Sequence, residues 1–287
     1  MPELPEVETV RRVLSQNLIG LKITDIKIKY EKIINYDIED FKNKIIGKKI
    51  KELNRKGKFL IFNLDDGAII SHLRMEGKYF YLKKDEIDNK HIHVIFYFDN
   101  GYALYYQDVR KFGRITYRDN NDIYSTEPLK LVGIDPILSK EIDYGFIYDT
   151  IVSRSVAIKT TLLDQSIIAG LGNIYVDEVL FESKINPLRP SNSITFDEVI
   201  RIFDNSVTIL SKAIEYKGTT IRSYTSSLGV SGSYQNFLKV HTKKQCSICK
   251  NDIIRVKING RTSYFCKNCQ RWLYEKNYRY YRWYCLR

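Results

Sequence analysis

Residues 2–18, PELPEVETVRRVLSQNL, determine how the fold begins. Apolar residues recur at helical spacing from Val7 to Leu18, and Gly20 marks the end of the pattern. Two prolines lie in the expected first turn, where a missing N–H group costs nothing, and three glutamates face the positive end of the helix dipole. The stretch predicts an N-terminal helix with an acidic, proline-containing first turn.

After this helix, apolar residues between 24 and 116 recur with a period of two, which is typical of half-buried strands. One hairpin is predicted over residues 59–73 with a turn at Asp66-Gly67, and a second over residues 91–106 with a turn at Asn100-Gly101. Several hairpins in series favour a β-sandwich.

The second half of the chain is rich in helical patterns. A polar stretch, residues 118–130, has the composition of a linker. Helical periodicity then returns in residues 144–153, 159–165, 174–183 and 196–216. Residues 218–235 form a Gly/Ser/Thr-rich loop too long for a simple connection, which makes it a candidate functional loop.

Length, composition and charge limit the possible classes of protein. A chain of 287 residues with 44% hydrophobic content should fold as more than one compact unit. It has no apolar run long enough for a membrane span and no secretion signal, so we expect a cytoplasmic protein with reduced thiols and no membrane partner. The formal net charge of +12 favours a polyanionic partner such as nucleic acid, although composition bias alone can produce it.

Four of the five cysteines form two CxxC pairs, Cys246 with Cys249 and Cys266 with Cys269. Two such pairs on hairpin turns can supply four thiolates in a tetrahedron around zinc, and Asn259-Gly260 between them provides a hairpin turn. Because four thiolates leave no open position, we expect one structural zinc ion per chain. Cys285 lies outside this spacing.

Seven motifs are distributed along the chain: PELPEVET (2–9), RKGKFL (55–60), SHLRMEGKY (71–79), DVRKFG (108–113), LLDQ (162–165), AGLGNIYVDEVLF (169–181), and GRTSYFC leading into CKNCQ (260–270). In this order they resemble the formamidopyrimidine-DNA glycosylases, the Fpg or MutM family.

The resemblance implies an α+β multidomain fold: a β-sandwich with an N-terminal helix, a helix-two-turn-helix domain and a C-terminal zinc ribbon. The expected segments are 1–130 for the catalytic sandwich, 131–236 for the helix-two-turn-helix domain with the lesion loop 218–235, 237–270 for the zinc ribbon, and 271–287 for a basic aromatic extension.

The resemblance also implies the catalytic residues. Pro2, exposed as an α-amine by removal of Met1, would be the nucleophile, since an α-amine titrates near pH 8 and is partly neutral at physiological pH. Glu3 would protonate the opening deoxyribose ring. Lys58 would contact phosphate and assist β-elimination, and Arg261 would grip phosphates and assist δ-elimination. Without the resemblance, Pro2 would be interpreted only as a helix-starting residue.

The resemblance also implies residues that bind DNA. Met75, Arg110 and Phe112 match three side chains that fill the gap left by a flipped nucleotide. Family phosphate contacts match His91, Arg110, Arg154, Lys159, Asn173 and Arg261. Arg222 or Tyr224 of the lesion loop would lie near the extruded base.

Two stretches depart from the family pattern. Residues 133–136 read GIDP instead of GPEP, which we interpret as a linker change. Residues 271–287 continue past the second CxxC and contain both tryptophans of the chain. Interleaved basic and aromatic residues suit stacking on unpaired bases, and packing over the zinc module is an equally open alternative.

The expected function is a bifunctional DNA glycosylase and AP lyase of base excision repair. It would remove oxidised purines, chiefly 8-oxoguanine and formamidopyrimidines, from damaged double-stranded DNA by β,δ-elimination, and we expect it to act as a monomer. One alternative is an endonuclease VIII-like enzyme for oxidised pyrimidines. Another is a catalytically inactive, zinc-containing DNA-binding protein.

Overall fold

The structure is a computed structural model that describes residues 1–219 and 232–271. Contacts divide the chain into two compact units. The first comprises Met1–Val132 and Ala213–Gln235, and the second comprises Gly133–Lys212 and Asn236–Arg287. Within the two described ranges, no helix combines the length and apolarity needed to cross a bilayer.

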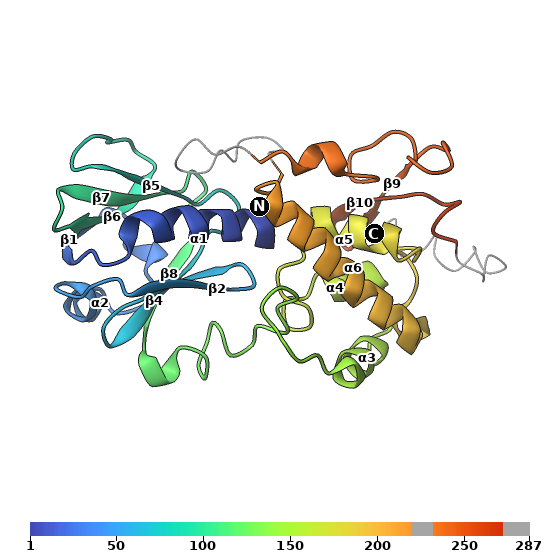
Figure 1. Ribbon diagram of the computed structural model, residues 1–287, viewed down its shortest axis with the longest axis horizontal. Helices are drawn as coiled ribbons and strands as arrows, with labels where there is room; N and C mark the ends of the chain where they lie inside the picture. Colours follow the sequence, from blue (N-terminus) through green and yellow to red (C-terminus); the bar gives the residue numbers. More distant parts are fainter. Residues whose placement is uncertain (220–231, 272–287) are drawn as a thin grey trace. The chain divides into compact units, whose positions relative to one another are not determined.

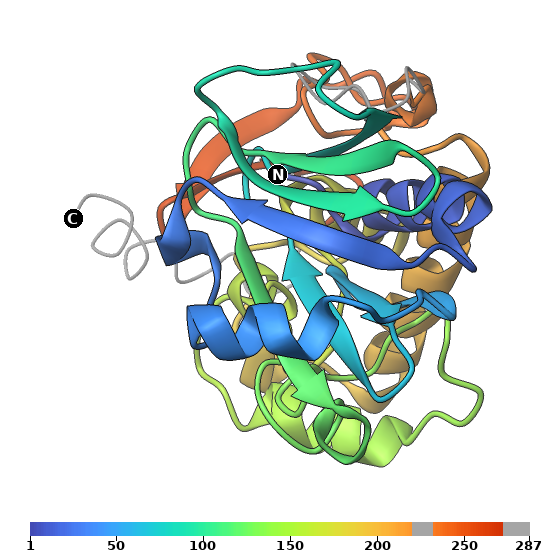
Figure 2. The same ribbon diagram turned by 90° about the vertical axis from the view of Figure 1, so that its left-hand side faces the viewer.

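The first unit contains two four-stranded antiparallel sheets that face each other, with helix α1 (Leu4–Leu18) alongside both (Figures 1 and 2). One sheet has the order β1-β6-β7-β5 and the other the order β2-β3-β4-β8. The strands are β1 (Ile23–Ile28), β2 (Glu52–Lys56), β3 (Phe59–Asn63), β4 (Gly67–His72), β5 (Lys78–Lys83), β6 (Ile92–Phe98), β7 (Tyr102–Gln107) and β8 (Arg114–Asp119). The predicted β-sandwich is confirmed.

Alternate side chains of these strands point to opposite faces of each sheet, and one face of each sheet contributes to a shared core. Buried side chains from both sheets meet between them, and α1 adds Val7, Val10, Leu14 and Leu18 to the same cluster. Both predicted hairpins are present, because β3 pairs with β4 and β6 with β7, each in antiparallel register.

Two parts of this unit differ from the predictions. Helix α2 (Ile38–Ile45) was not predicted; Asp37 caps its first turn and Phe41 and Ile45 are its buried residues. Residues 118–130 are part of the first unit and do not link two units: most are exposed, but Ile123 and Leu129 are buried in a small apolar cluster with Ile61, Ala68 and Ile70. Short 3₁₀ turns lie at Glu31–Ile33 and Asn120–Asp122.

The second unit contains the predicted helices and a two-stranded hairpin. The helices are α3 (Tyr144–Val152), α4 (Ile158–Leu162), α5 (Asn173–Glu182) and α6 (Phe196–Glu215), whose last turn belongs to the first unit. Strands β9 (Ile254–Ile258) and β10 (Arg261–Phe265) pair around the Asn259-Gly260 turn. Strand β10 packs on α5, and further 3₁₀ turns lie at Ser191–Ser193 and Tyr234–Phe237.

Candidate active site

The N-terminal turn holds the two residues expected to begin the chemistry. Pro2 and Glu3 are buried, and α1 begins at the next residue. The Glu3 backbone N–H donates to Glu6 Oε2 at 2.8 Å, whereas Glu6 Oε1 accepts the backbone N–H and the hydroxyl of Thr219 at 2.7 and 3.2 Å. Glu6 therefore does more than oppose the helix dipole, because it links Glu3 to a distant segment of the first unit.

A buried ion pair connects α1 to the turn that carries Lys58. The Arg55 side chain is fully buried; its Nε donates to Glu8 Oε2 at 3.2 Å and its Nη1 donates to the Gly57 carbonyl at 2.8 Å. Lys58 follows Gly57 and is itself buried. The Glu8–Arg55 pair thereby positions the Lys58 turn relative to the helix that begins beside Pro2.

Glu8 is held in its charged form by several arginines. Its Oε1 accepts hydrogen bonds from Arg11 and Arg12, each at 2.8 Å. Burial would raise the pKa of Glu8, but these hydrogen bonds and the charges of Arg11 and Arg55 outweigh burial and lower the pKa from 4.5 to about 2. This stabilisation is present above pH 4.5 and is lost as the pH falls toward 2.

We expect Glu8→Gln to lower the free energy of unfolding by about 2 kcal/mol at neutral pH, after allowance for solvent screening. The loss should shrink in acid, where the parent carboxylate is also protonated, and urea titrations at neutral and acidic pH measure both values. Glu39→Gln, which removes an exposed partner of Lys42, is the control and should leave the free energy of unfolding unchanged at both pH values. An equal loss from Glu8→Gln at both pH values would contradict this role.

Two loops of the first unit present the side chains predicted to enter DNA. Met75, between β4 and β5, is 39% exposed, and Phe112, between β7 and β8, is 47% exposed. The Arg110 guanidinium carbon lies 4.7 Å from the Phe112 ring centroid. Large apolar side chains held in solvent at loop tips are suited to insert into an opened base stack.

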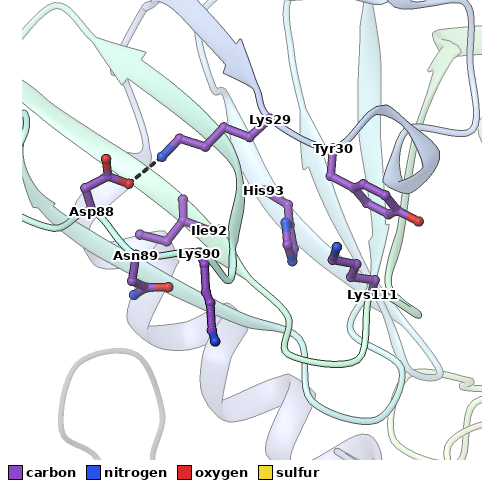
Figure 3. A pocket seen from close by; sticks show the side chains of 8 residues that line it. All are labelled: Lys29, Tyr30, Asp88, Asn89, Lys90, Ile92, His93 and Lys111. Carbon is purple, nitrogen blue, oxygen red and sulfur yellow. Dashed lines mark hydrogen bonds and ion pairs between the residues drawn. The ribbon is translucent and has the colours of Figure 1, made fainter.

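A basic pocket of about 410 Å³ lies beside the second of these loops (Figure 3). It is lined by Lys29, Tyr30, Asp88, Asn89, Lys90, Ile92, His93 and Lys111. Lys29 is ion-paired with Asp88, so Lys90 and Lys111 give the lining an excess of positive charge. They are the chain neighbours of His91 and Arg110, and the pocket therefore suits an anionic group near two predicted phosphate contacts.

In the second unit, Lys159 is buried in an ion pair, and its contact with phosphate stays a prediction. Its side chain is fully buried, and Nζ donates to Asp177 Oδ1 at 2.7 Å and to the Thr262 carbonyl at 3.2 Å. Breaking a buried ion pair costs about 3–5 kcal/mol. In this arrangement Lys159 braces α4 against α5 and β10 and does not reach solvent.

Two other predicted contacts of this unit already have protein partners. Helix α5 begins at Asn173, and Asn173 Nδ2 donates to the Thr262 carbonyl at 2.9 Å. Arg154 Nη1 donates to Asp164 Oδ2 at 2.8 Å and keeps a third of its side chain exposed. Contact of either residue with phosphate remains a prediction.

The four predicted zinc ligands form one cluster. The sulfurs of Cys246, Cys249, Cys266 and Cys269 all lie within 4.8 Å of one another. The Cys246–Cys269 and Cys249–Cys266 sulfur pairs are 3.7 and 3.4 Å apart, close to the edge of about 3.8 Å that a tetrahedron with Zn–S bonds of about 2.3 Å requires. The cluster can hold a metal ion.

Arg261 is exposed at the first position of β10, directly after the Asn259-Gly260 turn. This is the hairpin-tip position predicted for it. Most of the predicted lesion loop, including Arg222 and Tyr224, lies outside the described residues, as do residues 272–287 with Cys285.

Comparison with known proteins gives two family matches. The N-terminal domain of formamidopyrimidine-DNA glycosylase matches residues 1–115, and the H2TH domain of the same enzyme matches residues 132–225. The chain belongs to the formamidopyrimidine-DNA glycosylase family.

Similar relatives extend this match over nearly the whole chain. Formamidopyrimidine-DNA glycosylases from Streptococcus pneumoniae and Mycoplasmopsis pulmonis are 43% and 44% identical, each over 94% of this chain and 99% or 98% of their own. Two solved structures of Lactococcus lactis Fpg are 39% identical with a TM-score of 0.87, covering 94% of this chain and all of theirs. One holds DNA with N7-benzyl-Fapy-dG and the other DNA with an abasic site.

Several buried polar groups were not identified from sequence. Asp177 accepts hydrogen bonds from His241 Nδ1 at 2.8 Å and from the Tyr264 backbone N–H at 3.2 Å, in addition to Lys159, and thereby holds the β9–β10 hairpin on α5. Asp177 lies within a quoted family motif, as do Glu6 and Glu8. The positions of these three carboxylates within family motifs were the only indication in the sequence that they matter. The hydrogen-bond donors that they meet are determined by the tertiary fold.

Proposed function

We propose that this chain is a bifunctional DNA glycosylase and AP lyase that removes oxidised purines, 8-oxoguanine and formamidopyrimidines, from damaged duplex DNA. The observation that carries the proposal is the match to formamidopyrimidine-DNA glycosylases over 94% of the chain, which includes the PELPEVET turn. The relatives are bacterial DNA glycosylases, and we propose that this protein also acts on DNA in the cytoplasm.

The N-terminal amine carries the chemistry in this proposal. The Pro2 nitrogen attacks C1′ of the flipped nucleotide, and the bond from C1′ to the base breaks as the base takes up a proton. Glu3, held by its backbone bond to Glu6, protonates the ring oxygen as the sugar opens. A secondary amine yields an iminium that stays cationic without a proton, which acidifies the C2′–H bond.

Strand cleavage follows by two eliminations. Loss of the C2′ proton breaks the C3′–O bond, and loss of the C4′ proton in the second elimination breaks the C5′–O bond. Water then hydrolyses the iminium, which frees Pro2 from the sugar remnant and leaves a one-nucleotide gap. Lys58 assists the first elimination from its position in the β2–β3 turn, and Arg261 holds phosphate for the second.

Met75, Arg110 and Phe112 fill the gap left by the flipped nucleotide. Two of them are apolar and exposed at loop tips, which supports insertion between bases, and Arg110 can hydrogen-bond the orphaned base. His91, Arg154 and Asn173 contact backbone phosphates, and Lys90 and Lys111 in the basic pocket extend this set. Lys159 supports the hairpin from inside through Asp177 and the Thr262 carbonyl, and its predicted phosphate contact stays part of the proposal.

One structural zinc ion fits the cysteine cluster. Cys246, Cys249, Cys266 and Cys269 would hold it, and four thiolates leave no coordination position for water or substrate. When bound, zinc stabilises the fold of the β9–β10 hairpin and supplies no chemistry to the reaction. The predicted segments 1–130, 131–236 and 237–270 then serve as catalytic, DNA-binding and zinc-stabilised parts.

Incision assays test the function. We expect rapid cleavage of a duplex with 8-oxoguanine opposite cytosine, and much slower cleavage of one with thymine glycol. The reverse preference would indicate an enzyme for oxidised pyrimidines, and tight binding without cleavage of either duplex would indicate an inactive DNA-binding protein.

A further inference from the structure

One buried tyrosine lies beneath both loops that carry the proposed DNA-inserting side chains. Tyr106 is on β7, the strand between β5 and β6, and its side chain is fully buried in the core between the two sheets. Tyr79, its partner on the paired strand β5, packs against it with the rings tilted by 58° and their centroids 5.1 Å apart. Packing therefore fixes the ring, and the ring fixes the position of its hydroxyl.

Both loops pass very close to the Tyr106 hydroxyl, each at a glycine. A Cβ atom on Gly113, the residue after Phe112, would lie 1.7 Å from the Tyr106 hydroxyl oxygen, and one on Gly77, two residues after Met75, would lie 2.4 Å from it. Both distances are far below any real carbon contact. Each loop can pass this close to the hydroxyl only because glycine, at position 77 or 113, has no side chain.

The same hydroxyl meets the carboxylate that shapes the second loop. Asp108 is fully buried; its Oδ1 accepts the Arg110 backbone N–H at 3.0 Å, and its Oδ2 accepts the Gly113 backbone N–H at 2.8 Å. The Tyr106 hydroxyl donates a long hydrogen bond of 3.5 Å to Oδ2. Asp108 thus clamps both ends of the segment that contains Phe112, and Tyr106 supports the clamp.

Both loops also hold a strained residue next to an inserting side chain. Arg74 precedes Met75 with φ of 52°, and Lys111 lies between Arg110 and Phe112 with φ of 58°. Left-handed backbone at residues other than glycine costs energy, and it persists where surrounding contacts impose it. The Asp108 hydrogen bonds to Arg110 and Gly113 are such contacts on either side of Lys111, and the Arg74 backbone N–H donates to His72 Nδ1 at 2.9 Å.

We propose that the Tyr106 hydroxyl is a positioning group. It holds the Met75 loop and the Arg110–Phe112 loop in fixed positions relative to each other, so that the side chains of Met75, Arg110 and Phe112 enter the base stack in one step. The inference rests on the inserting role given to these side chains in the proposed function. Tyr106 is thereby added to the residues that control insertion, although it does not contact DNA. Its hydroxyl couples two loops that are 30 residues or more apart in the chain.

Tyr106→Phe tests the proposal, and Tyr105→Phe is the matched control. Tyr105 neighbours Tyr106 on the same strand and is equally buried, but its hydroxyl donates to the Lys83 carbonyl at 2.9 Å and its ring belongs to a different apolar cluster. Two single-turnover rates are measured for each variant: excision of 8-oxoguanine opposite cytosine, and cleavage of a preformed abasic site. Fluorescence of 2-aminopurine beside the lesion reports insertion directly.

We expect Tyr106→Phe to slow excision from the base-paired lesion about ten- to a hundredfold, because a loop displaced by a fraction of an ångström misplaces the inserting side chains. Cleavage of the abasic site, which has no base to extrude, should change less than about threefold, and the 2-aminopurine signal should slow with excision. Tyr105→Phe should match the parent in every assay.

Unchanged excision by Tyr106→Phe would overturn the proposal, and so would an equal loss on both substrates, which indicates general damage to the site. A similar loss in Tyr105→Phe would also overturn it. A parent protein that fails to excise 8-oxoguanine would instead overturn the proposed function, and with it the inserting role on which this inference rests.

Discussion

Replacement of Pro2 by glycine is expected to slow excision of 8-oxoguanine roughly a hundredfold or more, because it removes the proposed secondary-amine nucleophile. Glycine is as small as proline at the second position, so Met1 is still removed and a primary amine occupies the same place. An imine from a primary amine needs a proton to become cationic, whereas the proline iminium is cationic without one. Single-turnover excision rates measure the effect.

The control for this variant is binding. Pro2 contributes little to DNA affinity in the proposed mechanism, so Pro2→Gly should bind a duplex containing an uncleavable abasic-site analogue as tightly as the parent. A Pro2→Gly protein that excises and nicks DNA at the parent rate would show that another group is the nucleophile, and buried Lys58 would be the first candidate.

Loss of zinc is expected to have the second large effect. A two-stranded hairpin alone is marginally stable in water, and β9–β10 gains its core from the cysteines together with Phe181 and Val240. Cys266→Ser should lower zinc content well below one ion per chain and weaken binding of lesion DNA roughly a hundredfold, since the hairpin carries Arg261. Metal analysis and fluorescence anisotropy measure the two quantities.

Cys285→Ser is the matched control for the zinc ligand. Cys285 lies outside the CxxC spacing, so this variant should keep both its zinc and its DNA affinity. Full DNA affinity in Cys266→Ser without metal would contradict a structural role for zinc, and loss of zinc from Cys285→Ser would contradict the assignment of the four ligands.

Local sequence patterns predicted the elements that depend on local chemistry. Period-two runs around Asp66-Gly67 and Asn100-Gly101 predicted the two hairpins, because turn residues and alternation act over a few positions. The CxxC spacing predicted the cysteine cluster for the same reason. Helix α2 was missed because its eight residues lie within a segment dominated by strand patterns.

Ion pairs between residues far apart in the chain could not be predicted from local sequence patterns. The family resemblance implied a phosphate contact for Lys159, and the fold adds a buried ion pair with Asp177, 18 residues along the chain. Glu8 similarly pairs with Arg55 across 47 positions. Glu8, Arg55 and Asp177 lie within family motifs, but only the fold shows which residues they support.

The roles of Pro2 and Glu3 depend on one covalent bond, which borohydride trapping tests most directly. The native protein is incubated with a duplex containing 8-oxoguanine opposite cytosine, reduced with borohydride, and mapped by peptide mass spectrometry after its N-terminus is shown to lack Met1. We predict a stable complex with the deoxyribose remnant on the α-nitrogen of Pro2. Absence of a complex, or a remnant on a lysine such as Lys58, would contradict the account.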